Sequence, residues 1–535
     1  MRTASRPLCS SLAIATALMF PSVAGAQSFQ GTGQVVHGTA TVTPSVTGPP
    51  FGNAVGLPNS NSSNDPLPTT LITINSSQVV IDWLPTDKAS GSSPILFQAA
   101  GTLALFTTAS NSNLSNFAVL NRIIPSDTGR QIQFNGAIVS SLQGSTSQAA
   151  GTVYFYSPGG FVIGPTAAIN VGNLGLTTSD PWSGSGNWMN FDQAGNSVVT
   201  FRISNANAAI ATLAGSSIIT TANGSSYTAI VAPSITHAGS ITTGGAAALV
   251  AAEAATITFR PSNLFDIQVT SGTSNAAGLN IIGTITGPAS TNASTDLQRI
   301  YLAAIPKNTA LTMLISGGAS LGFTPAASAS VDGSTIVLSA GRDIVGGVVG
   351  NVSSPAQAQA NLSLTNATLR NRVVSSTTGL TQLSTLQGNL SFLGDVSLQT
   401  DGSASVVSSV SGRSITIGGA LNVNTNRSGT GAAPNPTGGA IMLSAANGGS
   451  LNVAGLTGLS ANAVGANGNS PGTPAGSGTG GTISVEASAG GSIALAGGLN
   501  ANANGQGGAA LIAGANGGIG QGGSVSLSAT GANSQ

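Results

Sequence analysis

The chain has 535 residues, of which only 5% are charged, with 14 basic and 14 acidic side chains. Soluble globular proteins carry roughly 25% charged residues. Because the few charges here are also evenly balanced in sign, they offer no electrostatic surface for nucleic acid or anionic lipid. Beyond the N-terminus no run of eighteen apolar residues occurs, so the sequence predicts no membrane span. The aliphatic residues come in short runs among 74 glycines, which favours a long β-protein over disorder.

Residues 1–26 have the three parts of a secretory signal, and we expect cleavage between Ala26 and Gln27. The single cysteine, Cys9, lies inside this signal. The mature chain is therefore expected to have no disulfide and no thiolate metal site. The three parts are the basic start with Arg2 and Arg6, the apolar core at 8–20 and the small residues Ala24–Ala26.

From residue 31 onward, short β-type runs are broken by small turn residues every eight to twelve positions. No segment of the first half has a sustained helical period, and AALVAAEAA (247–255) is assigned to a buried strand because Gly and Thr runs flank it. The runs include GTGQVVHGTATV (31–42), TLITINSSQVVIDW (70–83), ILFQAAGTLALF (95–106), FAVLNRII (117–124), QIQFNGAIVSSL (131–142) and GTVYFY (151–156).

A tight turn follows GTVYFY, at Ser157-Pro158-Gly159-Gly160. Proline sets φ near its helical value and glycine supplies the positive φ that other residues resist. After Asp180 the β pattern is interrupted by an irregular insertion that contains Trp182, Trp188 and Phe191, and it then resumes.

The C-terminal third is a repeat. Gly-Gly pairs that open a strand stand at Gly438, Gly480 and Gly522, and both intervals are 42 residues. Each unit holds two strand segments followed by Gly/Asn turns, which we interpret as two solenoid coils of about 21 residues each. About 24 such coils would make a rod of about 115 Å at roughly 4.8 Å per coil. The chain ends at Gln535 without a visible cap, so the sequence predicts either a longer gene product or a frayed end.

The first 270 residues resemble the N-terminal secretion domain of filamentous-haemagglutinin-like exoproteins, which use two-partner secretion, and they match the adhesin branch best. One phrase alone is weak, but six in the family's order behind a signal peptide are specific. They are GTGQVVHGTATV (31–42), VVIDW (79–83), AVLNRI (118–123), QFNGAIVS (133–140), GTVYFYSPGGFVIGPTAAINVGNLGLTTSD (151–180) and YTAIVAPSITHAGSITTGGAAALVAAEAATITF (227–259).

The resemblance implies an all-β chain folded as a right-handed parallel β-helix, or β-solenoid, with an N-terminal secretion-domain cap. It also implies export through the periplasm of a Gram-negative bacterium and engagement of an outer-membrane barrel transporter, leaving the protein secreted or at the cell surface. The expected organisation is a signal peptide (1–26), a secretion domain (27–270), irregular coils (271–430) and 42-residue Gly/Asn-rich repeats (431–535).

Two short stretches are candidates for recognition by the transporter. The family usually has an Asn-Pro-Asn-Gly turn where this chain has Ser157-Pro158-Gly159-Gly160, so the turn's recognition is in question although its geometry should survive. Asn121 and Arg122 are the other candidate. The competing interpretation is an asparagine turn with an arginine whose stem packs along the wall.

Catalytic and metal-binding residues are not expected. Enzymes of this fold need paired carboxylates, or an Asp/Arg/Lys cluster with calcium, on one face. Here the carboxylates are dispersed: Asp82 and Asp87 are the closest pair in sequence, and Glu486 is the sole carboxylate after Asp401. His37 and His237 are far apart in sequence and are assigned structural or surface roles. The sequence therefore predicts no enzyme, no cofactor and no metal.

Three functions remain open from the sequence. The leading one is a secreted β-helical exoprotein, an adhesin or matrix protein, with a host-cell, glycan or surface ligand. The second is a β-helical polysaccharide-active enzyme. The third is a purely structural or an ice- or surface-binding solenoid, suggested by the many outward Ser and Thr side chains, although the sequence shows no regular threonine array.

Overall fold

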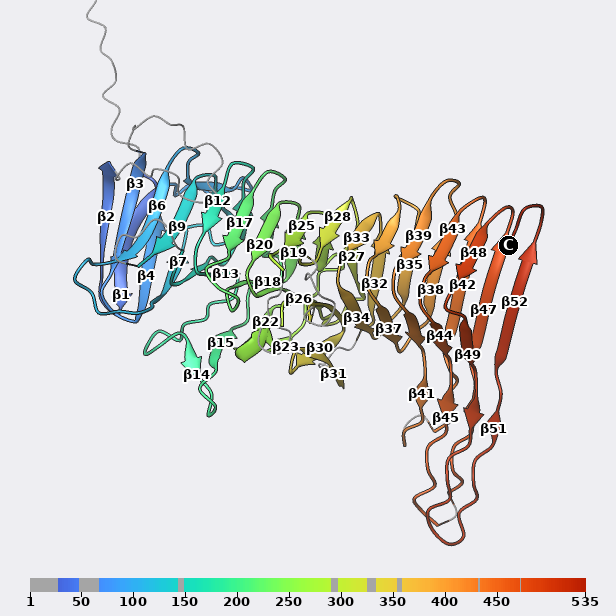
Figure 1. Cartoon of the computed structure of the whole chain (residues 1–535). Helices are drawn as coiled ribbons and strands as arrows, with labels where there is room; N and C mark the ends of the chain where they lie inside the picture. Colours follow the sequence, from blue (N-terminus) through green and yellow to red (C-terminus); the bar gives the residue numbers. More distant parts are fainter. Residues whose placement is uncertain are drawn as a thin grey trace, which may run out of the picture.

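A computed structural model describes residues 27–47, 67–142, 149–289, 297–324, 333–353, 358–431, 434–471 and 473–535. The expected signal peptide and its last residue, Ala26, lie outside these residues. Three long sheets, here named A, B and C, run side by side along an elongated rod (Figure 1). Successive strands pass from sheet B to sheet A to sheet C and return to sheet B, so each circuit is one coil of a parallel β-helix.

The strands of each sheet follow in spatial order. Sheet B consists of β1 (Gly31–His37), β4 (Gln78–Pro85), β7 (Ala118–Ile123), β10 (Thr152–Tyr156), β13 (Asn173–Thr177), β18 (Tyr227–Ala232), β21 (Ala246–Ala251), β26 (Arg299–Ala304), β29 (Thr335–Ala340), β34 (Arg372–Thr377), β37 (Val396–Thr400), β40 (Leu421–Asn424), β44 (Thr457–Ser460) and β49 (Leu499–Asn502). Sheet A consists of β5 (Ile95–Gln98), β8 (Ile132–Phe134), β11 (Gly160–Ile163), β16 (Ala209–Thr212), β19 (Ser234–His237), β24 (Leu279–Ile281), β27 (Leu311–Ile315), β32 (Ala360–Thr365), β35 (Thr381–Ser384), β38 (Ala404–Ser408), β42 (Ala440–Ala446), β47 (Thr482–Ser488) and β52 (Ser524–Thr530). Sheet C consists of β2 (Ala40–Thr47), β3 (Pro68–Ile74), β6 (Leu103–Thr108), β9 (Ala137–Ser141), β12 (Ala168–Asn170), β17 (Ser217–Thr220), β20 (Ser240–Thr243), β25 (Thr284–Thr286), β28 (Ala319–Leu321), β33 (Ala367–Leu369), β36 (Leu390–Phe392), β39 (Ser414–Ile417), β43 (Ser450–Val453) and β48 (Ser492–Leu495).

The remaining strands lie outside the three walls. Sheet D consists of β14 (Asn190–Phe191), β15 (Ser197–Phe201), β22 (Ala254–Phe259), β23 (Phe265–Ser271), β30 (Arg342–Val345) and β31 (Val348–Ser353). Two small sheets near the C-terminal end consist of β41 (Arg427–Ser428), β45 (Ala463–Val464) and β50 (Gly505–Gln506), and of β46 (Gly478–Thr479) and β51 (Gly520–Gln521). The helical content of the described residues is one 3-10 turn, η1 (Pro261–Asn263).

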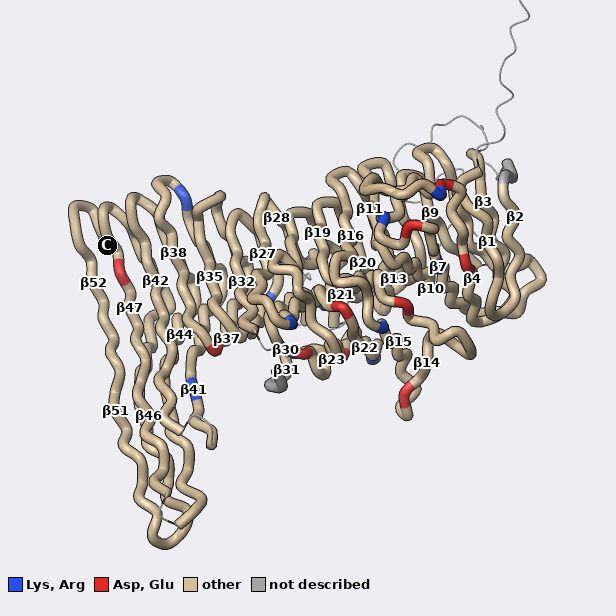
Figure 2. Tube along the Cα trace, turned by 180° about the vertical axis from the view of Figure 1, so that it is seen from behind, with Lys and Arg blue, Asp and Glu red and all other residues tan. Residues whose placement is uncertain are grey.

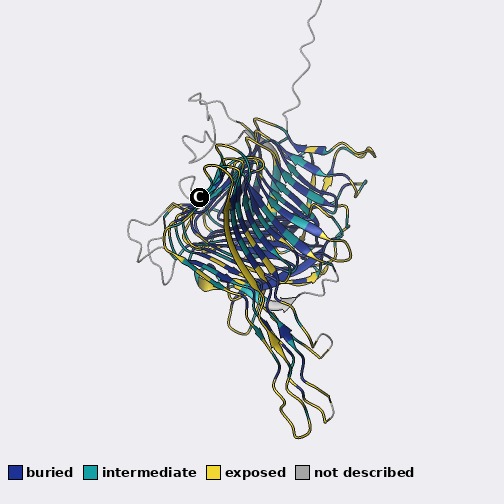
Figure 3. Cartoon of the chain, turned by 90° about the vertical axis from the view of Figure 1, so that its right-hand side faces the viewer, coloured by how far each residue is buried: buried dark blue, intermediate teal, exposed yellow. Residues whose placement is uncertain are grey.

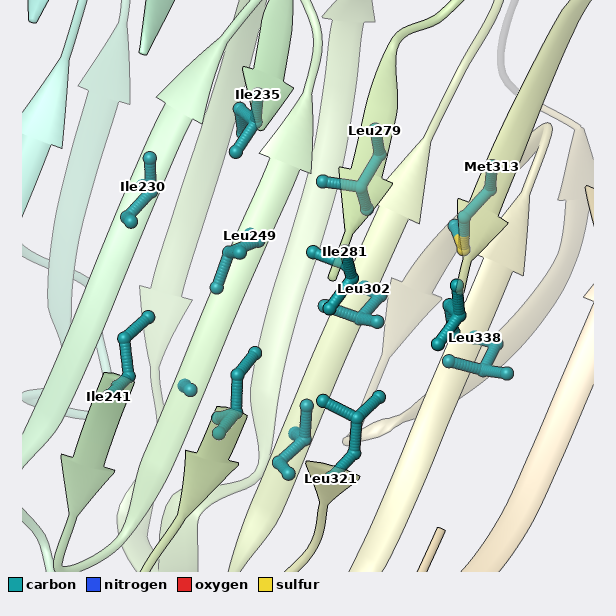
Figure 4. Packing of buried hydrophobic residues seen from close by; sticks show 14 of the residues in the cluster. Ile230, Ile235, Ile241, Leu249, Leu279, Ile281, Leu302, Met313, Leu321 and Leu338 are labelled. Carbon is teal, nitrogen blue, oxygen red and sulfur yellow. The ribbon is translucent and has the colours of Figure 1, made fainter. Parts of the chain in front are cut away.

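The interior of the rod is filled by aliphatic ladders. In sheet B, Ile230 is in register with Leu249, which is followed by Leu302 and Leu338 in the next two coils, and all four side chains are buried (Figure 4). Successive rungs are separated by about 4.8 Å, so each side chain contacts its counterpart above and below. Burying one such side chain stabilises the fold by roughly 1.5–3 kcal/mol. The β structure expected at 247–255 is confirmed, but it is two strands and not one: β21 lies in sheet B, β22 begins at Ala254 and lies in sheet D, and Ala252 and Glu253 lie between them.

Sheet D gives sheet B a second hydrophobic core on its outer face. The strands YTAIVA and AAALVA are buried at every position, as expected for strands that are covered on both faces. Outward residues such as Val231 and Val250 pack with Phe201, Ile257 and Ile267 of sheet D. Sheet D therefore covers the middle of the rod, along its lower side in Figure 1.

An antiparallel cap closes the N-terminal end. β1 pairs with β4 and β2 pairs with β3, both antiparallel, whereas strands of the coils pair in parallel. Register shifts interrupt both cap strands, and Pro44 lies in β2, so the exposed edges are poor templates for a further strand. Phe29 is fully buried beneath the cap, and its ring centroid lies 5.1 Å from that of Trp83 and 5.0 Å from that of Phe97.

The assignment of two coils to each 42-residue unit is wrong, because each unit is a single coil. Ile441 is in direct register with Ile483, and Ile483 with Val525, as successive strands of sheet A. Earlier coils are shorter: Val373 pairs with Val396, an interval of 23 residues. With 14 strands in sheet B, the rod is about 62 Å long at roughly 4.8 Å per interval, not about 115 Å.

The extra residues of each unit leave the rod as a fin, defined as residues 426–431, 434–437, 461–471, 473–480 and 503–523 (Figures 1 and 3). Its glycines are required by close packing, since a Cβ on Gly476 would lie 1.8 Å from the carbonyl oxygen of Pro434. Asparagine side chains link the coils: the Oδ1 of Asn462 accepts a hydrogen bond of 2.7 Å from the amide of Asn504. The Gly/Asn-rich half of the unit is held by stacking on itself, because the large aliphatic side chains of the fin are exposed. They are Val464, Leu511, Ile512 and Ile519.

Charged side chains are confined almost entirely to the rod before the fin (Figure 2). After Arg427 the sequence contains a single charged residue, Glu486. Among the residues described, no helix has the length and apolar character needed to cross a membrane.

Candidate functional site

Asn121 lies inside the rod and not on its surface. It is on β7 between Val119 and Ile123, which both point into the core, and it is fully buried. Its Oδ1 accepts a hydrogen bond of 3.0 Å from the indole Nε1 of Trp83, and its Nδ2 donates to the carbonyl oxygen of Tyr154 at 3.2 Å. The side chain therefore satisfies a buried tryptophan and ties three successive coils together.

Arg122 points the opposite way, onto the outer face of sheet B. It donates from Nη1 to Asp82 at 2.9 Å and from Nε to Asp180 at 3.1 Å, and its guanidinium lies 5.2 Å from the ring centroid of Trp182. Asp82 is its register partner on β4, and Asp180 follows β13. One arginine thus joins two coils to the start of the 181–196 insertion.

The electrostatics of this cluster are set mainly by burial. Partial burial raises the pKa of Asp180 above its ordinary value, although Arg122 acts in the opposite direction. Burial likewise raises the pKa of Asp82, and it raises the pKa of Tyr156 to about 12. Both carboxylates bond to the same guanidinium, so the arrangement fixes strands together and presents no activated nucleophile.

The Ser157–Gly160 turn is packed between neighbouring coils. The amide of Gly160 donates to the carbonyl oxygen of Ser157 at 3.1 Å, which closes the turn. A Cβ on Gly159 would lie 2.2 Å from the carbonyl oxygen of Arg130 in the coil before it. An asparagine at position 159, which is usual in the resembled family, would therefore have no room here. Ser157 and both glycines are buried and Pro158 is half-buried.

The expected cleavage site adjoins the cap. Gln27 is the first described residue, and its Nε2 donates to the carbonyl oxygen of Gly31 at 3.1 Å. Gln30 in turn donates to the carbonyl oxygen of Gln27. Cleavage after Ala26 stays a prediction, as does recognition of Asn121, Arg122 and the turn by a transporter.

Asp82, Asp87 and Asp401, among the carboxylates considered for catalysis, are held by arginine side chains. Asp87 pairs with Arg130 at 2.9 Å, so it does not share a partner with Asp82. Glu253 is buried and pairs with Lys307 at 2.7 Å. In the part of the chain that the structure describes, no group of three or more His, Cys, Asp or Glu side chains could hold a metal ion.

The insertion makes two contacts with sheet B that the sequence did not reveal. Trp188 is fully buried against the outer face of sheet B, with its ring centroid 4.8 Å from that of Tyr154. Gln78 of β4 makes two hydrogen bonds to the backbone of Met189, at 2.9 and 3.2 Å. The apolar residues of the insertion were the available signal, but nothing in the sequence indicates which strand they cover.

His237 is a buried, fully hydrogen-bonded histidine. Its Nε2 donates to the carbonyl oxygen of Thr284 at 2.9 Å, and its Nδ1 lies 2.6 Å from the hydroxyl of Thr212, which donates to it. Burial lowers the pKa of His237 from 6.5 to about 4. His37 is half-buried on the cap, 6.3 Å from Trp182 between ring centroids.

The stability of the fold should depend on the ionisation of His237. Between pH 6.5 and about 4 the unfolded chain binds a proton that the folded chain does not, so this contribution is complete above pH 6.5 and is lost as the pH falls toward 4. The loss amounts to about 3 kcal/mol. Urea unfolding at pH 7.5 and 4.5 measures it: His237→Gln should have a smaller pH dependence by that amount. His37→Gln is the control and should retain the full dependence; equal curves for the native chain and His237→Gln would contradict the prediction.

Comparison with known proteins gives a likeness among solved structures only. No family model matches the chain, and no curated protein matches it. Among solved structures, the chain is similar to the HMW1 secretion domain from Haemophilus influenzae, with 15% sequence identity and a TM-score of 0.35. The alignment covers 95% of this chain and 97% of the other. A likeness at this TM-score carries no weight for function.

Proposed function

We propose that the chain is a secreted β-helical exoprotein that leaves a Gram-negative cell by two-partner secretion and acts as an adhesin or surface-interaction protein. The observation that supports this is the coincidence of the six family-like phrases with successive elements of the rod. The first phrase forms β1 and the start of β2 in the cap, and the others form strands of the coils between β4 and β21, together with β22 of sheet D.

The physical properties of the chain suit this route. It has no cysteine outside the expected signal and few charges, so it can cross a pore as an unfolded chain. Each coil then pairs with the coil already formed, since successive strands of sheets A, B and C are hydrogen-bonded neighbours. Stacking of this kind favours folding on the far side of the membrane.

A secretion assay tests the proposal. The full chain is expressed in a Gram-negative host with and without a two-partner transporter from the source bacterium, and the chain in the medium and on protease-accessible cell surfaces is measured. We expect export only with the transporter. Equal export without it would refute the proposal.

The turn can be tested in the same assay. Of the six predicted recognition residues, Arg122 and Pro158 are the ones left partly exposed. Pro158→Ala should lower export severalfold if the turn is recognised, while Pro165→Ala, in the next corner of the same coil, should leave export unchanged. An equal effect of both substitutions would refute a recognition role for the turn.

A catalytic role is not part of the proposal. Asp82 and Asp180 lie on the same outer face but both bond to Arg122, while Asp87 pairs with Arg130 and Glu253 with Lys307. We expect no turnover of acidic or neutral polysaccharides by the purified chain. Measurable release of oligosaccharide, lost on substitution of Asp82 or Asp180, would overturn this part of the proposal.

A second candidate function, binding of a surface polymer, has one observation in its favour. Eight consecutive strands of sheet C place a neutral polar side chain at the same register position on the outer face. Two residues further along each strand the side chains are of mixed type, from Thr242 to Leu393, so the polar side chains form a single row and not a two-dimensional array. The row is about 34 Å long at roughly 4.8 Å per strand. A single row of this length fits a linear neutral glycan better than an ice lattice. The row is Ser217, Ser240, Thr284, Ser320, Thr368, Ser391, Thr416 and Asn452.

Co-sedimentation with insoluble cellulose tests this candidate. The triple variant Thr284→Ala, Thr368→Ala, Thr416→Ala should lose binding. The control variant Thr236→Ala, Ser363→Ala, Ser405→Ala changes outward hydroxyls of sheet A and should retain it. Absence of binding by the native chain, or ice shaping in its place, would refute the candidate.

A further inference from the structure

The segment from Asp180 to Phe191, here called the strap, runs back over coils that precede it in the chain. It leaves sheet B after β13 and crosses the outer face toward the cap. Its partners lie on β7, β4 and β1: Arg122 holds Asp180, Gln78 holds Met189, and the ring of His37 lies 6.3 Å from that of Trp182. A late segment is therefore attached to the earliest strands.

The contact with β4 is made by a side-chain amide that pairs with a backbone amide and carbonyl, as a neighbouring strand would. The Nε2 of Gln78 donates to the carbonyl oxygen of Met189 at 2.9 Å, and its Oε1 accepts from the amide of Met189 at 3.2 Å. The two residues are 111 positions apart. Because β4 is the one strand that β1 pairs with, whatever holds β4 also holds the cap.

Trp188 fixes the middle of the strap. It is 1% exposed and packs on Tyr154 of β10. The hydroxyl of Tyr154 lies 3.3 Å from that of Tyr227 at the start of β18. Tyr154, the ring on which Trp188 packs, is thus linked to β18 of the following coil.

The end of the strap pairs antiparallel with β15, and its last side chain is exposed. Phe191 is 63% exposed on β14. The turn after it is held locally, since Asp192 accepts hydrogen bonds from the amides of Ala194 and Asn196, both at 2.9 Å. Substitution of Phe191 therefore changes the strap without touching its attachment points.

We infer that the strap is a lock for the N-terminal cap, and that it closes only after the coils through β18 have formed. β1 is an edge strand with an irregular register and one pairing partner, so its own hydrogen bonds give it little protection. The strap supplies the missing restraint through β4 and β7. The first coils consequently remain in an open, unlocked state until residues well beyond 180 have folded.

Hydrogen exchange on the full chain tests this coupling. Trp188→Ala and Gln78→Ala should each speed exchange of the amides of β1 and β4 by about tenfold or more, together with those of the strap. Amides of β35 and β38 should be unaffected. Phe191→Ala is the matched control and should leave the cap unchanged. Faster exchange confined to the strap would overturn the inference, and Gln78→Ala decides the matter if Trp188→Ala fails to fold.

The order of closure is tested by pulse labelling during refolding. Cap amides should gain protection at the same rate as strap amides, although more than 100 residues separate β4 from Met189 along the chain. Protection of the cap before the strap would show that the cap closes alone and would overturn the inference.

Discussion

Replacing Gly160 by alanine should unfold the coils around it, at a cost of more than about 4 kcal/mol. The residue has φ +93°, which a side chain resists. A Cβ at this position would also lie 1.9 Å from the carbonyl oxygen of Ala209, which is its register partner in the next coil. That oxygen belongs to the backbone of a paired strand, so it cannot move aside without breaking the stack. Urea unfolding followed by circular dichroism measures the effect.

Two matched substitutions separate the causes. Gly184 has φ +95° and nothing within 4 Å of the position of its Cβ, so Gly184→Ala should cost only the backbone strain of about 1–3 kcal/mol. Gly159 has no positive φ, but its Cβ would meet the carbonyl oxygen of Arg130, so Gly159→Ala isolates the steric part. A cost for Gly160→Ala no larger than that for Gly184→Ala would contradict the prediction.

Close packing also accounts for Gly159, which stands where the resembled family usually has its second asparagine. Gly159 faces the coil before it and Gly160 the coil after it, so both positions are closed to side chains. The residues that the turn can hold are limited by the distance between neighbouring coils, and this distance exists only in the assembled stack. Sequence inspection can recognise the turn but cannot say which neighbour approaches it.

Much of the fold could be predicted from local pattern. Alternating aliphatic residues indicate strands, and small turn residues at short intervals indicate coils. Asn121 could also have been placed from the sequence, because it stands two residues from both Val119 and Ile123 and so shares their face. Its neighbour Arg122 then points outward, where Asp82 and Asp180 lie.

Long-range partners could not be predicted in the same way. The 42-residue period is equally compatible with two short coils or with one coil and an excursion, and only the register of Ile441 with Ile483 decides between them. The strap depends on Gln78 meeting Met189, a contact that no local pattern encodes. The strands of sheet D likewise have the same sequence pattern as those of the coils, and only the structure shows that they cover sheet B.

Phe29→Ala should remove the plug of the N-terminal end and destabilise the cap by about 3–5 kcal/mol. The ring is fully buried and lies within 6.4 Å, between centroids, of five other aromatic rings. It makes an edge-to-face contact with Trp83, whose indole donates to Asn121, so the loss extends to a buried polar pair. The surrounding rings are those of Trp83, Phe97, Phe106, Phe134 and Phe155.

The effect should be local, because a stacked rod can lose its end without losing its middle. Hydrogen exchange should rise in β1, β4 and β5 and stay unchanged beyond β18, and limited proteolysis should cut first near residue 30. Leu84→Ala is the control, since Leu84 is 49% exposed on β4 and should cost far less. Uniform destabilisation along the rod, or none at the cap, would contradict the prediction. Phe29 stands two residues after Gln27, so a cleavage even slightly beyond the expected site would remove the plug itself.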